Sequence, residues 1–138
     1  MPRSHKIIID TNLWISFLLT NQFSFLDKLL TKKKVKLAFS GELLAEFLEV
    51  VKRPKLSKYF KTEDLEKIIE IINQYAEFYP VNSTVEICRD EKDNFLLALA
   101  KESKANFLIT GDKDLLVIKK FELTEIITIA EFKTNIIS

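Results

Sequence analysis

Short apolar runs that lead directly into acidic residues constrain this sequence more than any other feature. The run Lys6–Ile9 is rich in isoleucine and ends at Asp10, and the run Phe107–Ile109 ends three residues before Asp112. A continuous apolar run of this length is typical of a strand buried on both faces of a sheet. An acidic side chain at the end of a buried strand or helix lowers the stability of the fold unless a positive charge compensates it. The pattern therefore predicts buried strands and points to a metal site.

Strand-like and helix-like segments alternate along the whole chain. Strands are expected at Lys6–Ile9, Val35–Phe39, Phe78–Val81, Ala105–Ile109 and Glu125–Ile129. Helices are expected at Asn12–Leu19, Phe25–Leu30, Ser40 to Val51, Thr62–Tyr75, Lys92–Ser103 and Lys113–Ile118, with Ser40 and Thr62 as N-caps and a last helical turn after the final strand. This alternation predicts an α/β fold with a mainly parallel sheet of about five strands, covered by helices on both faces.

Length and composition indicate one ordinary globular domain over residues 1–138. The chain has only two glycines and three prolines, which argues against long linkers. Its single cysteine, Cys88, excludes an internal disulfide and a cysteine-based zinc site. No stretch approaches the roughly 18 apolar residues of a membrane span, so a cytoplasmic protein is expected.

Four acidic residues are expected to meet at one edge of the sheet. Ligands of parallel sheets bind outside the carboxyl ends of the strands, where Asp10 and Asp112 would stand. Glu46 lies at the margin of the apolar face of its helix, roughly 120° from the centre of that face at 100° per residue. Asp93 lies on a helix between two strands. Each acid also has an ordinary explanation: Asp10 and Asp112 as helix caps, Asp93 in a first helical turn, Glu46 as a solvated edge residue.

Gathered together, the four carboxylates would need compensation. Two of them about 6 Å apart repel by roughly 3 kcal/mol at an effective dielectric near 20. They would have to take up protons or bind a cation. Oxygen ligands without histidine or cysteine favour Mg²⁺ or Mn²⁺ over zinc, and the only histidine, His5, stands near the N-terminus. No Gly-rich phosphate loop, nucleophile elbow or Cys/His pair offers a competing catalytic set.

Two basic tracts could hold phosphate groups. The net charge is only +1, but basic residues are concentrated at Lys32–Lys34 with Lys36, and again at Lys52, Arg53, Lys55 and Lys58. Such tracts bind nucleic-acid backbones in a salt-dependent way. They are equally compatible with solvated helix ends and loops.

Four motifs, taken in order and spacing, resemble the PIN domain family over nearly the whole chain. They are Ile7-Ile8-Ile9-Asp10-Thr11-Asn12, then Ser40 with Glu46, then Arg89-Asp90-Glu91-Lys92-Asp93-Asn94-Phe95-Leu96, and finally Leu108-Ile109-Thr110-Gly111-Asp112-Lys113-Asp114-Leu115-Leu116. The resemblance is to the branch of toxins from toxin–antitoxin systems, within the group that includes VapC-type ribonucleases.

This resemblance implies a three-layer, Rossmann-like α/β/α fold with strand order 3-2-1-4-5. It also implies a Mg²⁺- or Mn²⁺-dependent endoribonuclease that leaves 5′-phosphate and 3′-hydroxyl ends, acting as a toxin with a cognate antitoxin and as a homodimer. Asp10, Glu46, Asp93 and Asp112 would be the catalytic and metal-binding quartet, supported by Asn12 and Asp114. Two alternatives stay open: an inactive PIN-like module that binds RNA or protein, and a nuclease that acts on DNA.

Overall fold

A six-stranded sheet forms the centre of the molecule in the computed structural model, which describes residues 4–20, 24–81 and 91–137. Residues 21–23, at the expected junction of the first two helices, and residues 82–90, which include Cys88 and the start of the third motif, lie outside the described part. The strands are β1 (His5–Ile9), β2 (Val35–Phe39), β3 (Ala76–Phe78), β4 (Phe107–Ile109), β5 (Lys120–Phe121) and β6 (Thr124–Ile127). Their order is β3-β2-β1-β4-β6-β5.

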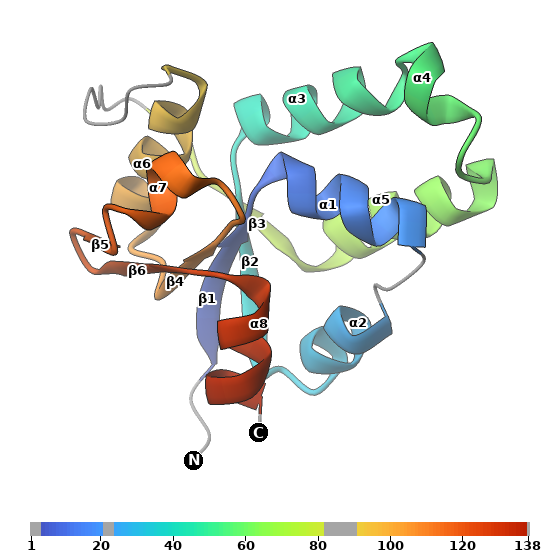
Figure 1. The fold of residues 1–138 in the computed structure, drawn as a ribbon. Coiled ribbons are helices and arrows are strands. Elements are labelled where there is room, and N and C mark those ends of the chain that lie inside the picture. The colour runs from blue at the N-terminus through green and yellow to red at the C-terminus, as the bar shows by residue number, and fades with distance from the viewer. Residues whose placement is uncertain (1–3, 21–23, 82–90, 138) are drawn as a thin grey trace.

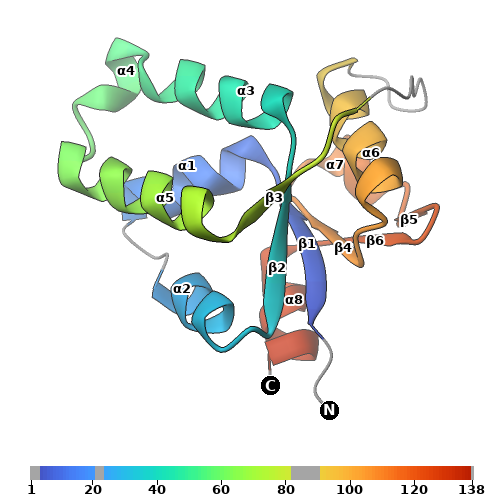
Figure 2. The same ribbon diagram turned by 180° about the vertical axis from the view of Figure 1, so that it is seen from behind.

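The helices lie on both sides of these strands. They are α1 (Thr11–Thr20), α2 (Ser24–Thr31), α3 (Gly41–Val51), α4 (Pro54–Ser57), α5 (Thr62–Tyr75), α6 (Glu91–Ser103), α7 (Lys113–Leu116) and α8 (Ile129–Phe132), which continues as a π-helical turn over Lys133–Ile137. Two opposite views place α1, α2, α3 and α5 to one side of the strands and α6 and α7 to the other (Figures 1 and 2). The expected α/β architecture is confirmed. No helix in the described ranges is long and apolar enough to cross a membrane.

Strand β1 lies at the middle of the sheet, as its apolar sequence predicts. It pairs in parallel with β2 through Ile7 and Leu37, and with β4 through Ile9 and Ile109. Ile7, Ile8 and Ile9 are at most 1% exposed. Because β1, β2 and β4 run in the same direction, the residues that follow them are brought to one edge of the sheet.

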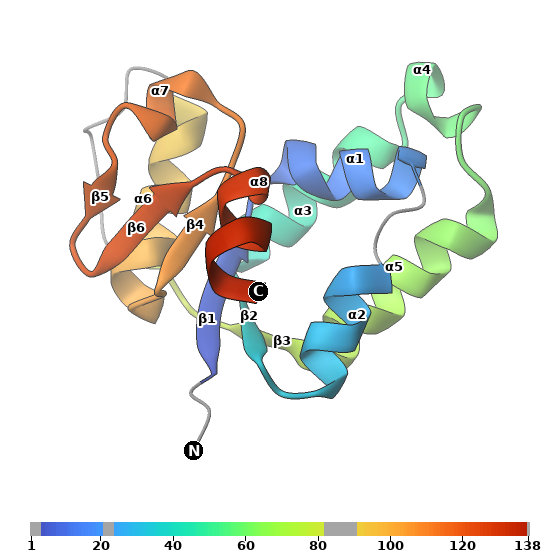
Figure 3. The same cartoon turned by 60° about the horizontal axis from the view of Figure 1, so that its bottom comes forward.

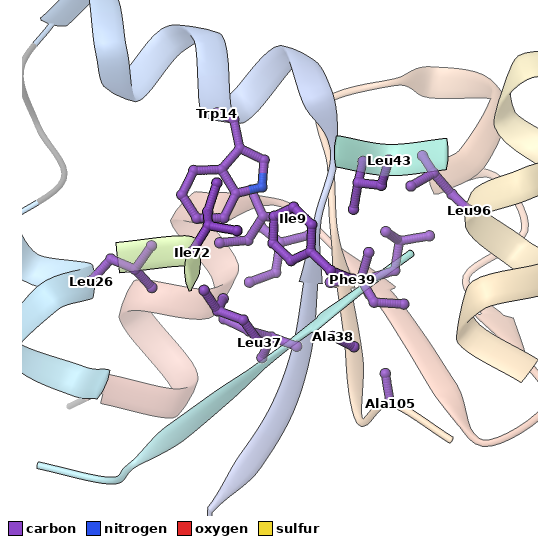
Figure 4. Close-up of a cluster of buried hydrophobic side chains, with 14 of the residues drawn as sticks. Ile9, Trp14, Leu26, Leu37, Ala38, Phe39, Leu43, Ile72, Leu96 and Ala105 are labelled. Carbon is purple, nitrogen blue, oxygen red and sulfur yellow. The ribbon is translucent and has the colours of Figure 1, made fainter. Parts of the chain in front are cut away.

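Aromatic side chains fill the space between α1 and the strands. Trp14 extends from α1 towards β1 and β2 (Figure 4) and packs against Phe39 and Phe47, with ring centroids 5.7 and 6.4 Å away. Figure 3 brings forward α8, which lies close to β1. Phe132 of α8 contacts Phe107, and Lys133 lies over the ring of Phe25 on α2. Trp14 is fully buried and therefore belongs to the core.

Helix α3 holds Glu46 at the margin of its buried face. Ser40 caps the helix: its hydroxyl accepts a hydrogen bond from the Leu43 N–H at 3.2 Å. Leu43, Phe47 and Val51 are buried along the face that packs on the core. Glu46 is half-buried, as expected from its place on the helical wheel.

Several element boundaries differ from the expected ones. The third strand is Ala76–Phe78 and not Phe78–Val81, because it follows Tyr75 without an intervening loop. Thr62 is the first helical residue of α5 and not its cap, a position that Lys61 occupies without a side-chain hydrogen bond. Pro54 opens the short helix α4 in addition to following α3. The two-residue strand β5, antiparallel to β6, brings the strand count to six; without it the order follows the expected 3-2-1-4-5 pattern.

Candidate functional site

Asp10 and Asp112 lie where the central strands β1 and β4 end. The Asp10 N–H donates to the carbonyl of Ile109 at 3.2 Å, which ties the two strand ends together. Asp10 Oδ1 accepts the Leu13 N–H at 2.9 Å, and Asp112 Oδ1 accepts the Asp114 N–H at 2.9 Å. Both residues therefore serve as helix caps, as one interpretation of the sequence expects. Capping engages one oxygen of each carboxylate and does not remove either residue from the strand edge.

All four acids expected in the quartet line one small hollow at this edge. Asp10 and Asp93 are buried, with 5% and 9% exposure, while Glu46 and Asp112 are half-buried. The hollow has a volume of about 30 Å³. Its wall is completed by Thr11, Asn12, Phe95 and Leu96. About 10–15 Å³ suffices to admit one water molecule, so the hollow can take water or a small cation.

The electrostatics of the hollow disfavour a negative charge on Asp10. Burial raises the pKa of the Asp10 carboxyl, and the nearby charge of Asp112 acts in the same direction. Hydrogen bonds from Thr110, Leu13 and Gly111 lower it but do not overcome the effect of burial. A divalent cation in the hollow would favour the ionised carboxylate. The site is thus one in which a proton and a cation would compete.

Thr110 is a residue of this site to which the sequence interpretation assigned no role. It is fully buried, and its hydroxyl donates a hydrogen bond to Asp10 Oδ2. The Thr110 hydroxyl oxygen also accepts a hydrogen bond from the Asp112 N–H at 3.0 Å. Thr110 therefore connects two of the four acids. The available signal was its place directly after an apolar run and two residues before an acid.

The donor set fits a hard divalent cation. The side chains around the hollow offer carboxylate, hydroxyl and amide oxygens, which Mg²⁺ and Mn²⁺ prefer. The Thr11 hydroxyl oxygen is buried without a hydrogen-bond partner in the described part of the chain. However, no three His, Cys, Asp or Glu side chains among the described residues are spaced so that they could hold an ion. Mutual repulsion keeps carboxylates apart unless a cation lies between them, so binding would require them to approach one another.

The hollow is lined by Asn12 but not by Asp114 or His5. Asn12 is exposed and lines the hollow. Asp114 is half-buried on α7 and is not among the lining residues; its backbone N–H reaches Asp112. His5 opens β1 at the other end of the strand, where its ring packs on Phe107 with centroids 5.5 Å apart.

The two basic tracts lie at different distances from the hollow. Lys32–Lys34 and Lys36 are at the start of β2, a strand of five residues, whereas the hollow lies beyond its end. At about 3.3 Å per residue the tract is roughly 16 Å away. The length of β2 therefore separates this tract from the hollow. The second tract begins six residues after Glu46 at the end of α3, about 9 Å along the helix axis at 1.5 Å per residue.

Comparison with known proteins agrees with the fold. The sequence matches the PIN domain family over residues 6–114. It is 36% identical over 120 residues to the uncharacterised protein MJ1680 of Methanocaldococcus jannaschii, covering 83% of this chain and 75% of that protein. The structure is similar to a chain of VapBC2 from Rickettsia felis, crystallised with a DNA fragment from its promoter, with a TM-score of 0.57 and 18% identity over 88% of this chain and 96% of the other. The family match spans far more than half of the sequence: this chain belongs to the PIN domain family.

Proposed function

We propose that this protein is a Mg²⁺- or Mn²⁺-dependent endoribonuclease and the toxin of a type II toxin–antitoxin system. The observation that carries the proposal is the convergence of Asp10, Glu46, Asp93 and Asp112 on one hollow at the carboxyl edge of the sheet in a PIN domain. Four carboxylates from four separate elements share this hollow. Metal-dependent phosphodiester hydrolysis gives them a common purpose.

Each residue has a defined task in this proposal. Asp10, Glu46, Asp93 and Asp112 would hold the cation, which supplies activation of water and stabilisation of charge on the phosphate. Asn12, exposed at the rim, would orient the phosphate or a bound water. The basic residues Lys52, Arg53, Lys55 and Lys58, all exposed at the end of α3 and on or beside α4, would hold phosphates that flank the cut.

The toxin role and the partners rest on similarity to the VapBC2 complex. That structure holds VapBC2 bound to a DNA fragment from its promoter, so a cognate antitoxin is proposed as the partner of this chain. RNA is proposed as the substrate by resemblance to VapC-type ribonucleases. A homodimer is expected on the same grounds and would be measured by analytical ultracentrifugation of the purified chain.

The test is cleavage of a mixed RNA pool by the purified protein in Mn²⁺, in Mg²⁺ and in EDTA. We expect cleavage with either cation and none in EDTA. Asp93→Asn, which keeps the size of the side chain and removes its charge, should abolish cleavage and the growth arrest caused by expression. Growth arrest that persists when both Asp10 and Asp93 are replaced by alanine would refute the toxin mechanism.

A second candidate is a PIN-like module that binds RNA or a protein without hydrolysing it. It is favoured by the absence, among the described residues, of three metal-ligating side chains at coordinating distance. The same assay separates the two functions. RNA that is retained but stays intact in Mn²⁺ supports the binding module, whereas RNA that is cut supports the nuclease.

A further inference from the structure

A broad open groove lies at the edge of the sheet opposite to the acidic hollow. It has a volume of about 710 Å³ and runs between the end of α2, the start of β2 and the end of α5 with β3. Lys33, Lys36, Tyr75 and Glu77 are among its lining residues. We propose that this groove binds the phosphate backbone of a single-stranded nucleic acid at a distance from the cut site. The identity of that strand as substrate RNA rests on the proposed function.

The charges around the groove favour an anion. Lys32, Lys33, Lys34 and Lys36 are all exposed, and no carboxylate in the described part of the chain forms an ion pair with them. The acid of the groove, Glu77, is already engaged by Lys6 at 3.8 Å and by the Tyr79 hydroxyl at 2.9 Å. A cluster of lysines with a single, already paired acid produces a positive potential in the groove.

The strand register places Lys36 directly beside another lysine, Lys6. Lys6 on β1 and Lys36 on β2 are register partners, so their side chains leave the sheet on the same face. Glu77 pairs with Lys6, which leaves Lys36 as the uncompensated member of the pair. Like charges placed directly opposite each other destabilise a sheet. A bound phosphate would relieve this repulsion.

Lys33 stands at a position where the backbone favours glycine. Helix α2 ends with the Lys33 N–H bonded to the Leu30 carbonyl and the Lys34 N–H bonded to the Leu29 carbonyl, and Lys33 has φ of 59°. This arrangement is a Schellman motif, in which glycine is the usual residue at the left-handed position. A side chain there costs about 1–2 kcal/mol. Replacing Lys33 by glycine therefore removes its charge without straining this turn.

The chemistry of the groove is compatible with a phosphate backbone. Lysine binds phosphate groups as a compact point charge. The groove described here contains lysines and no arginine. Half-buried Tyr75 adds an aromatic wall, and single-stranded nucleic acids are held by a positive groove combined with aromatic side chains.

The test is binding of a fluorescein-labelled single-stranded RNA of mixed sequence in EDTA, measured by fluorescence anisotropy at several salt concentrations. The test variant is Lys33→Gly/Lys36→Thr, which suits the left-handed turn and the strand while removing two charges. Two lost phosphate contacts should lower the slope of log affinity against log salt by about 1.4 and weaken binding about 25-fold at about 0.1 M salt. Thermal unfolding followed by circular dichroism verifies that the variant is folded.

The matched control is Lys101→Ala/Lys120→Ala, which removes the same charge from exposed positions on α6 and β5. Its salt slope should stay close to that of the original protein. Equal losses in the two variants, or displacement of the RNA by polyglutamate at equal charge concentration, would overturn the groove proposal. Because binding in EDTA requires no hydrolysis, intact RNA in the Mn²⁺ assay would count against the proposed function alone.

Discussion

The carboxyl group of Asp10 is buried, and its burial makes the stability of the fold depend on pH. Burial raises the pKa of its carboxyl above the ordinary value of 3.8. Between the ordinary pKa and the raised one, the folded chain holds more protons than the unfolded chain, so the free energy of unfolding decreases as pH rises. We expect Asp10→Asn, measured in EDTA by thermal unfolding, to be more stable than the original protein at neutral pH. This gain should disappear below pH 3.8.

The control for this prediction is Asp27→Asn on α2, because Asp27 is exposed. This variant should show no comparable gain at neutral pH. An Asp10→Asn protein that is less stable than the original at every pH would mean that the hydrogen bonds of the carboxylate outweigh its burial.

Thr110 is predicted to position two acids of the quartet. Thr110→Val would remove the hydrogen bond to Asp10 and leave the N–H of Asp112 without its partner. We expect a loss of about 1–3 kcal/mol in the free energy of unfolding and about 10–100-fold weaker Mn²⁺ binding. Urea denaturation and titration calorimetry measure the two effects. Thr110→Ser keeps the hydroxyl and should restore both; failure of the serine variant would show that the methyl group, and not the hydrogen bonds, matters.

At the scale of elements, the cap of α3 determines how firmly Glu46 is held. Ser40 is fully buried and its hydroxyl satisfies the Leu43 N–H. Ser40→Ala should lower the free energy of unfolding by about 1 kcal/mol, whereas Ser40→Gly should cost only a few tenths. Urea denaturation of both variants checks this. Equal losses would indicate that packing around Ser40, and not capping, is the dominant contribution.

We predict that one substitution in the hairpin between β5 and β6 can raise the free energy of unfolding. Phe121 pairs with Thr124, so Glu122 and Leu123 form a two-residue loop, and Glu122 has φ of 54°. Glycine is favoured at such a position. Glu122→Gly should therefore raise the free energy of unfolding by about 1 kcal/mol or slightly more, measured by urea denaturation. Leu123→Gly is the matched control, since Leu123 lacks positive φ, and it should lower stability. A Leu123→Gly protein that is more stable than the Glu122→Gly protein would contradict this assignment of the turn.

The strongly patterned elements of this protein were predictable from sequence, and the weakly patterned ones were not. The central strand and α3 have clear apolar patterns and a clear cap, and both were confirmed. Strand β3 has only three residues and begins directly after α5, so no turn signal marks it. Thr62 resembles a cap, yet the backbone turns one residue earlier, at Lys61. Two-residue β5 depends on pairing with β6 and leaves no periodic signal of its own.

For the molecule as a whole, the convergence of the acids was predictable because it follows from the direction of the strands. Features that depend on side-chain packing were not predictable. Parallel strands bring Asp10 and Asp112 to one edge whatever the details of the core. The size of the hollow depends on how α3 and α6 pack beside the strand ends, whereas the role of Thr110 depends on its hydroxyl reaching Asp10 and Asp112. The position of Lys32–Lys36 at the opposite edge also follows from strand direction, because the tract precedes β2 and does not follow it.

Cation binding is predicted to stabilise the whole fold. The four acids belong to the end of β1, to α3, to α6 and to the cap of α7, so an ion held between them would link both halves of the sheet edge. A ligand that binds only the folded chain adds about 2.7 kcal/mol at 100 times its Kd, which corresponds to a rise of roughly 10 °C in Tm for a domain of this size. Differential scanning fluorimetry with and without Mn²⁺ measures this shift. Asp93→Asn should remove most of it, while Asp64→Asn on α5 should retain it. Equal shifts in the two variants would place the cation elsewhere and would contradict a metal site in the hollow.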